Sequence, residues 1–190
     1  PGFTSRAIVA TVSANWFRSM ALTMTDYLQY SFITKETMMD VNDIIKVMNA
    51  QNEKASSLSL SKGGFEGWLQ AELWYHLNII KGESTEREVQ YPHSLTYCDL
   101  VCDATMTKPA QWVEVKAYGI FRDGDEPRFL DGVAADVMKI DGKPADASGS
   151  VYLVVPKAIS DKVEALIMRR GWTNFKRTDS VYAYIYYADV

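Results

Sequence analysis

Two consecutive apolar segments, TYCDLVCDA and WVEVKAY in the range 96–118, constrain the fold of this chain most strongly, because both carry acidic residues. Side chains of an extended strand alternate between its two faces, so Glu114 and Lys116 share one face of the second segment. Asp99 lies in the middle of the first segment, among residues typical of a buried strand. A buried carboxylate costs free energy unless its charge is compensated. If the two strands pair as a hairpin, Asp99 and Glu114 are expected to meet across the ladder.

Hydrophobic periodicity predicts the other elements of the chain. The predicted helices cover residues 13–33, 41–57, 65–80, 131–140 and 160–170. The predicted strands cover residues 87–91, 96–104, 112–118, 151–155 and 181–187. The segment 65–80 (FEGWLQAELWYHLNII) has a strong amphipathic pattern, and Asp40 is a candidate cap for the helix that begins at residue 41. With 190 residues, of which 47% are hydrophobic, the chain is long enough to build a substantial core.

The formal net charge of −4 argues against a protein that binds polyanions through bulk positive charge. Contact with nucleic acid therefore requires a local basic patch. The best candidate interleaves cations with aromatic side chains, namely Arg169, Arg170, Lys176 and Arg177 with Trp172 and Phe175. The alternative is a helix C-terminus whose cations stabilise the helix dipole.

Cys98 and Cys102 lie four residues apart in one predicted strand, which spaces them too widely for a disulfide. Reduced cysteines are typical of a cytoplasmic protein, and this location is expected here. No apolar run approaches the roughly 20 residues of a membrane span, so no membrane partner is expected. Because the chain begins at Pro1 rather than Met, its first residues are expected to result from processing or to be foreign to the natural protein.

The acidic strands resemble the PD-(D/E)xK nucleases, a superfamily with the restriction-endonuclease-like fold. The matching residues are Asp99 in CDLVCD and Glu114-Val115-Lys116 in VEVK, and the order of elements from about residue 63 to 155 looks like the αβββαβ core of that family. Cys98 stands where the name of the motif has proline. The resemblance covers about half of the chain and leaves residues 1–60 outside.

This resemblance implies an α/β fold in which a central mixed β-sheet is flanked by helices. It divides the chain into an N-terminal helical extension, residues 1–60, and a nuclease-like domain, residues 61–190. It also implies that Asp99, Glu114 and the backbone carbonyl of Val115 bind Mg²⁺ or Mn²⁺, and that Lys116 assists hydrolysis. Clustered carboxylates suit such a hard divalent cation for independent chemical reasons.

Many members of the family add a glutamate from the helix before the first strand, and here that helix offers Glu66 and Glu72. At about 100° per residue, apolar residues including Ile79 and Ile80 define an inward arc that contains Glu72, whereas Glu66 lies nearer its edge. Glu72 is therefore the predicted catalytic acid of the helix. Pairing of Glu72 with a buried base is the structural alternative.

The helix at 131–140 carries Asp136 and Lys139 in a position that resembles the helices flanking the cleft in this family. Lys139 is expected either to contact a phosphate or to be a solvated helix charge.

We expect a metal-dependent nuclease that hydrolyses phosphodiester bonds of nucleic acid, DNA rather than RNA, and a homodimer is considered. Three alternatives stay open: a catalytically silent nuclease-fold module that binds nucleic acid or protein, a helical adaptor built on the N-terminal helices, and a solvated Glu114–Lys116 surface pair. Two other interpretations carry less weight. These are a zinc site of Cys98, Cys102, His76 and His93, and a nucleophilic Cys98–His93 pair.

Overall fold

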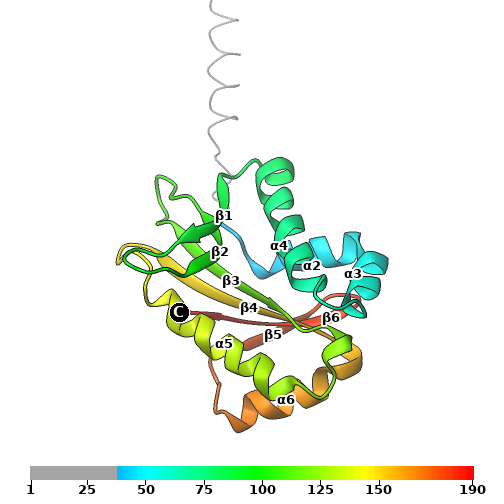
Figure 1. Ribbon diagram of the computed structural model, residues 1–190. Coiled ribbons are helices and arrows are strands. Elements are labelled where there is room, and N and C mark those ends of the chain that lie inside the picture. The colour runs from blue at the N-terminus through cyan, green and yellow to red at the C-terminus, as the bar shows by residue number, and fades with distance from the viewer. Residues whose placement is uncertain (1–37) are drawn as a thin grey trace, which may run out of the picture. The chain divides into compact units, whose positions relative to one another are not determined.

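The computed structural model describes residues 38–190, which form a six-stranded sheet with helices on both of its faces (Figure 1). The helices are α2 (Val41–Ala50), α3 (Asn52–Ser59), α4 (Phe65–Tyr75), α5 (Glu126–Ile140) and α6 (Ser160–Arg169), with the π-helical turn η1 (His76–Lys81) and the 3₁₀ turns η2 (Ile120–Arg122) and η3 (Lys157–Ile159). The strands are β1 (Thr85–Gln90), β2 (Tyr97–Cys102), β3 (Gln111–Ala117), β4 (Ser148–Pro156), β5 (Lys176–Asp179) and β6 (Ala183–Asp189). The helix predicted at 13–33 lies outside the described residues.

The sheet has the strand order β1-β2-β3-β4-β6-β5 and is mixed. Strands β3 and β4 run parallel, and every other neighbouring pair is antiparallel. A parallel pair needs a long crossover connection, which α5 provides between β3 and β4. The predicted α/β fold with a central mixed sheet flanked by helices is thereby confirmed.

Two hydrophobic layers hold the helices on the sheet. On one face, Ile44 of α2 and Leu69 of α4 pack with Val113 and Val115 of β3. On the other face, α5 and α6 cover the opposite side chains of β4, such as Leu153. Because side chains alternate along β3, Glu114 projects toward the α5 face. The candidate site therefore lies beside α5.

Helix α2 belongs to the same packed unit as the sheet. Asp40 caps it as predicted, since its side chain accepts a hydrogen bond of 2.7 Å from the backbone N–H of Asn42. Ile44 and Met48 of α2 are completely buried in the core that includes the strands. The expected boundary at residue 60 therefore falls inside this unit.

Several element bounds differ from the predicted ones for local reasons. The predicted helix 41–57 is two helices, because the backbone of Gln51 leaves the helical region at φ −124° and ψ 35°. Helix α5 begins at Glu126, five residues before its predicted start, and Pro127 suits its first turn because that turn needs no N–H donor there. The edge strand β5 was not predicted. No helix in the described part of the chain is long and apolar enough to cross a bilayer.

Candidate functional site

Strands β2 and β3 pair as the predicted antiparallel hairpin, with Leu100 opposite Val113. Continuing this register would set Asp99 opposite Glu114. At this point the side chain of Asp99 takes the place of a backbone carbonyl of the ladder, because its Oδ2 accepts a hydrogen bond of 2.8 Å from the N–H of Val115. Burial raises the pKa of Asp99, and this hydrogen bond offsets part of the rise. The two predicted metal-binding carboxylates thus lie near the same end of the hairpin.

Glu114 is a completely buried carboxylate in the middle of β3. The hydroxyl of Tyr91 donates a hydrogen bond of 2.7 Å to its Oε1. The ammonium of Lys139 lies 3.0 Å from Oε1 and 3.1 Å from Oε2. Burial, with the nearby charges of Asp99 and Asp136, raises the pKa of Glu114 to about 8 despite these partners. Burial first, and then the two neighbouring carboxylates, therefore outweigh the partners that stabilise the ionised form of Glu114.

Asp136 of α5 joins two lysines. Its Oδ1 lies 3.0 Å from Nζ of Lys139, and its Oδ2 lies 3.2 Å from Nζ of Lys116. Burial alone would lower the pKa of Lys116, but Glu66, Asp136 and Asp99 raise it above its ordinary value. The buried Oδ2 of Asp136 accepts no well-oriented hydrogen bond from the described residues. A chain of alternating charges thus runs from Glu114 to the end of β3.

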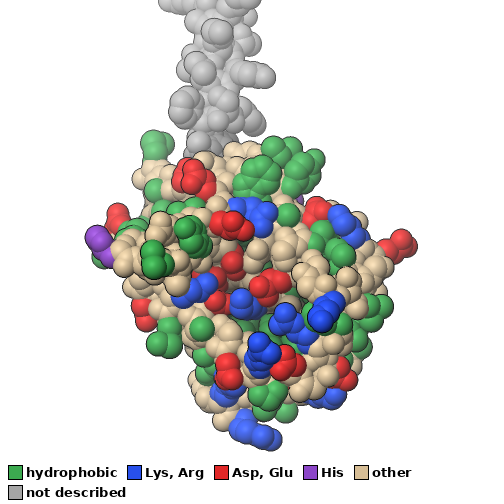
Figure 2. All heavy atoms as spheres, in the orientation of Figure 1, with side chains coloured by type: hydrophobic (Ala, Val, Ile, Leu, Met, Phe, Trp, Pro, Cys, Tyr) green, Lys and Arg blue, Asp and Glu red, His purple; other side chains and the backbone are tan. Residues whose placement is uncertain are grey.

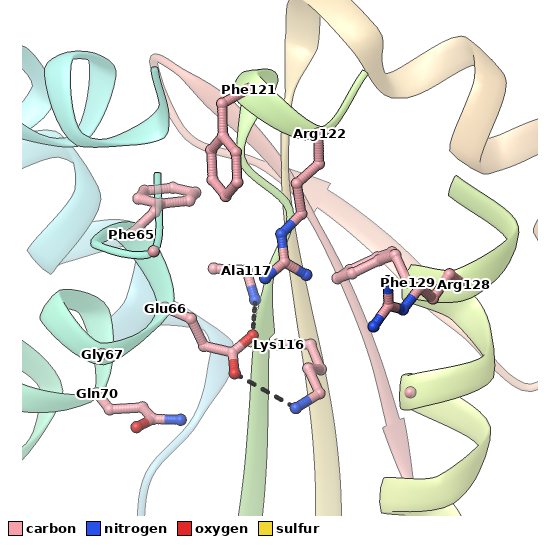
Figure 3. Close-up of a pocket in the computed structure, with 12 residues that line it drawn as sticks. Phe65, Glu66, Gly67, Gln70, Lys116, Ala117, Phe121, Arg122, Arg128 and Phe129 are labelled. Atoms are coloured by element: carbon pink, nitrogen blue, oxygen red, sulfur yellow. Dashed lines mark hydrogen bonds and ion pairs between the residues drawn. The ribbon is translucent and has the colours of Figure 1, made fainter. Parts of the chain in front are cut away.

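Glu66, not Glu72, is the helix acid of this cluster. Its Oε1 lies 3.3 Å from Nζ of Lys116, and its Oε2 accepts a hydrogen bond of 3.1 Å from the N–H of Ala117. Figure 3 shows both interactions at the C-terminal end of β3. The pairing of Glu66 with the backbone of β3 fixes the distance between α4 and the strand.

The predicted position of Glu72 is wrong. Its carboxylate accepts hydrogen bonds from Gln51, from Lys54 at 2.8 Å and from Trp68 at 3.0 Å, and these partners lower its pKa although burial alone would raise it. The predicted arc failed because Ile79, one of the residues that defined it, is 59% exposed. The chain is π-helical at 76–81, so the rotation of 100° per residue does not continue there.

A cleft of about 400 Å³ opens beside Lys116 and Glu66, between the N-terminal part of α4 and the segment from η2 to α5. Its lining includes Arg122 of η2 and Arg128 of α5, which Figure 3 shows on the side of the cleft opposite α4. Neither arginine was predicted from the sequence as a site residue. The sequence did contain a signal for them, because both arginines follow β3 in the segment FRDGDEPRF, residues 121–129, within 12 residues of Lys116.

The residues of the zinc alternative are not brought together. His76 bonds to Asp43 at 3.1 Å, and Cys98 donates to the carbonyl groups of Leu100 and Val113, each at 3.3 Å. Burial raises the pKa of the Cys98 thiol to about 12, which disfavours its use as a nucleophile. Over residues 38–190, no three His, Cys, Asp or Glu side chains are placed so that they hold a metal ion without rearrangement.

Two of the four cations of the predicted basic patch pair with acidic neighbours. Arg170 lies 2.7 Å from Asp131, and Arg177 lies 2.6 Å from Glu164. Lys176 lies over the ring of Tyr187, with 5.8 Å between its Nζ and the ring centroid. Compared with this patch, the arginines of the cleft have fewer acidic partners.

No family model, curated protein or solved structure matches this chain. The residues and the geometry of the site are therefore the basis for its function.

Proposed function

We propose that this protein is a metal-dependent nuclease of the PD-(D/E)xK type that hydrolyses phosphodiester bonds, with DNA as its substrate. The observation that carries this proposal is the charge of the partly buried cluster. Four carboxylates, Asp99, Glu114, Asp136 and Glu66, accompany two ammonium groups, those of Lys116 and Lys139. With all six groups ionised the cluster has a formal charge of −2, which one divalent cation neutralises. The carboxylates of this cluster also offer the oxygen ligands that a hard cation requires.

The order of the elements supports the same proposal. Helix α4, the antiparallel strands β1 to β3, helix α5 and strand β4 follow one another along the chain. This is the αβββαβ order that the resemblance implies. The acidic residues lie on the second and third of these strands, where the motif places them.

The donor groups fit Mg²⁺ or Mn²⁺, provided that Lys139 moves; the carbonyl of Val115 also accepts a hydrogen bond of 3.4 Å from Gln70. Asp99, Glu114 and the carbonyl of Val115 supply only oxygen atoms, which both cations prefer. Lys139 contacts both oxygens of Glu114, so this carboxylate must be released by Lys139 before it ligates a cation. When bound, the cation supplies a water of lowered pKa and a positive charge beside the scissile phosphate.

The remaining residues of the cluster position charge for this reaction. Lys116 is held between Glu66 and Asp136, so its ammonium is directed to the side of the cleft where a phosphate would gain negative charge. Tyr91 orients the carboxylate of Glu114 through its hydrogen bond. Glu66 holds both the Lys116 ammonium and the N–H of Ala117, and it thereby fixes the end of β3.

The test is cleavage of plasmid, linear duplex, single-stranded DNA and RNA with Mg²⁺ or Mn²⁺, and with excess EDTA. We expect cleavage that requires the cation and that falls at least about 100-fold in Lys116→Ala, because one charge that stabilises a transition state contributes this much. Lys46→Ala, at a largely exposed lysine of α2, is the matched control and should retain wild-type rates. Undiminished cleavage in EDTA, or wild-type turnover of Lys116→Ala, would overturn the proposal.

A second candidate is a nuclease-fold module that binds nucleic acid without cleaving it. The contact of Lys139 with both oxygens of Glu114 favours this alternative, because an internal cation then occupies part of the place of the metal. This module would bind nucleic acid, show no cleavage with any cation, and gain no stability from Mg²⁺ or Mn²⁺. Thermal unfolding with and without each cation separates the two candidates.

A further inference from the structure

The cleft beside Lys116 exposes two arginines that have no ion pair within residues 38–190. Arg122 and Arg128 are both exposed and line the cleft from η2 and α5. The guanidinium of Arg122 lies 5.3 Å from the ring centroid of Phe121. By contrast, Arg170 and Arg177 of the predicted basic patch each form an ion pair with a carboxylate. The two cleft arginines are therefore available for an anionic ligand.

The acidic residues near these arginines are mostly engaged elsewhere. Glu66 contacts Lys116 and the backbone of β3, and Asp123 lies 2.6 Å from Lys162. An adjoining groove shares Arg122 and Arg128 with the cleft and adds Lys62, with Asp125 as a further acid. Figure 2 shows Lys and Arg side chains gathered on this face beside the acidic side chains. Positive charge thus accumulates locally on a chain whose net charge is −4.

The walls of the cleft combine aromatic rings with glycines. Phe65 and Phe129 are buried in its lining, whereas Phe121 is half-buried and presents part of its ring. A Cβ atom added at Gly63 or Gly67 would meet nothing within 4 Å, so these positions leave the cleft open on the side of α4. The volume of about 400 Å³ is within the range of sites that hold one small organic ligand.

We infer that this cleft binds a single strand of nucleic acid, with its phosphates on Arg122 and Arg128 and a base against Phe121. The strand passes along the groove toward Lys116. This inference rests on the proposed function and specifies its substrate: the strand that enters the site is unpaired. Guanidinium groups bind phosphate oxygens through paired, charge-assisted hydrogen bonds, and an aromatic ring stacks on any base, so the binding has little sequence preference.

The experiment measures fluorescence anisotropy of a labelled short oligothymidine and of a duplex of the same length. EDTA is present throughout, so that cleavage does not occur. We expect the wild type to prefer the single strand, and Arg122→Gln and Arg128→Gln to weaken its binding about tenfold each. Each substitution should also reduce the slope of log affinity against log salt concentration by about 0.7, the value for one phosphate contact on a single strand. Phe121→Leu should weaken binding by about fivefold or more without changing this slope.

Lys46→Gln, at a largely exposed lysine of α2, is the matched control and should leave affinity and salt slope unchanged. Far-ultraviolet circular dichroism and melting temperature verify that each variant is folded, which the exposure of both arginines favours. The inference is overturned if the wild type does not bind the single strand, if it prefers the duplex, or if the double arginine variant binds as the wild type does.

These outcomes are separate from those of the nuclease proposal. If affinity depends on both arginines but no cation supports cleavage, the cleft inference stands and the nuclease proposal fails. If cleavage requires a cation but neither arginine affects binding, the nuclease proposal stands and the cleft inference fails.

Discussion

Glu114 makes the stability of the metal-free protein depend on pH, and Glu114→Gln should remove this dependence. Burial and the charges of Asp99 and Asp136 raise its pKa from 4.5 to about 8. Between these values the folded protein keeps a proton on Glu114 that the unfolded chain has released. The free energy of unfolding therefore falls as pH rises through this window, and the loss ends above about pH 8, where both states are ionised.

The size of the effect follows from the same shift. Each pH unit inside the window lowers the free energy of unfolding by about 1.4 kcal/mol at most. From about pH 5.5 to about pH 7.5, the wild type should therefore lose about 3 kcal/mol relative to Glu114→Gln. Glutamine keeps the shape of the side chain and accepts the hydrogen bond from Tyr91, but it does not titrate. The altered contact with Lys139 adds an offset that is similar at both pH values.

Urea unfolding of the two proteins in EDTA at several pH values measures this difference. Glu86→Gln, at an exposed glutamate of β1, is the matched control, and its stability should remain parallel to that of the wild type. Saturating Mg²⁺ should flatten the pH dependence of the wild type, because a bound cation favours the ionised carboxylate. A difference between wild type and Glu114→Gln that stays constant with pH would mean that Lys139 and Tyr91 keep Glu114 ionised. Burial and the neighbouring carboxylates would then not raise the pKa of Glu114 as described.

Three further predictions concern the other groups of the cluster. Lys139→Met should destabilise the metal-free protein by about 3 kcal/mol above about pH 9, where Glu114 of the wild type is ionised, and much less in a Glu114→Gln background, because it removes the cation that pairs with this buried charge; an additive double-mutant cycle in urea unfolding would contradict this pairing. Glu66→Gln should lower the cleavage rate, whereas Glu72→Gln should reduce the melting temperature and leave the rate unchanged; the opposite pattern would restore Glu72 as the helix acid. The proposed metal site predicts that millimolar Mg²⁺ or Mn²⁺ raises the melting temperature of the wild type and that Asp99→Asn abolishes this rise; an undiminished rise in the variant would exclude Asp99 as a ligand.

The hairpin of β2 and β3 was predictable because its signal is local. A strand alternates its side chains strictly, so the positions of Asp99, Glu114 and Lys116 follow from spacing alone once the strands are identified. Their register was constrained as well, since a slip by one residue would turn the apolar side chains of both strands to the wrong face. The structure confirms that the two strands pair and that both acids lie at one end of the pairing.

The choice between Glu66 and Glu72 was not predictable in the same way. The rotation per residue was extrapolated from Phe65 to Ile80, but the regular α-helix ends at Tyr75. An error in the rotation per residue accumulates along the segment. Including its π-helical end therefore placed the predicted inward arc wrongly. Packing of Glu72 against Lys54 and Gln51 depends on the break at Gln51 between α2 and α3, which periodicity did not reveal.

The cleft arginines and the interactions of Asp136 depend on contacts between distant elements. Arg122 and Arg128 follow β3 along the chain. They line one cleft with the N-terminal part of α4 only because the crossover between β3 and β4 passes through η2 and α5. Asp136 lies in an amphipathic helix, and the hydrophobic periodicity of such a helix does not distinguish a single buried acid from an acid at the edge of the apolar face. Such residues become identifiable when the packing of α5 on β3 is known.

Asp136 also connects the two halves of the site energetically. It holds Lys139 through Oδ1 and Lys116 through Oδ2, while Lys139 reaches across to Glu114. If Lys139 released Glu114 to the proposed cation, its ammonium would still have Asp136 as a partner, so the release would leave this lysine with a counter-ion. When Lys139 pairs more strongly with Asp136, the ion pair between Asp136 and Lys116 is expected to weaken. The ammonium of Lys116 would then interact with Glu66 and with a ligand in the cleft. Binding of a cation at Glu114 and binding of phosphate near Lys116 are therefore expected to favour each other, since both draw on the same bridging carboxylate.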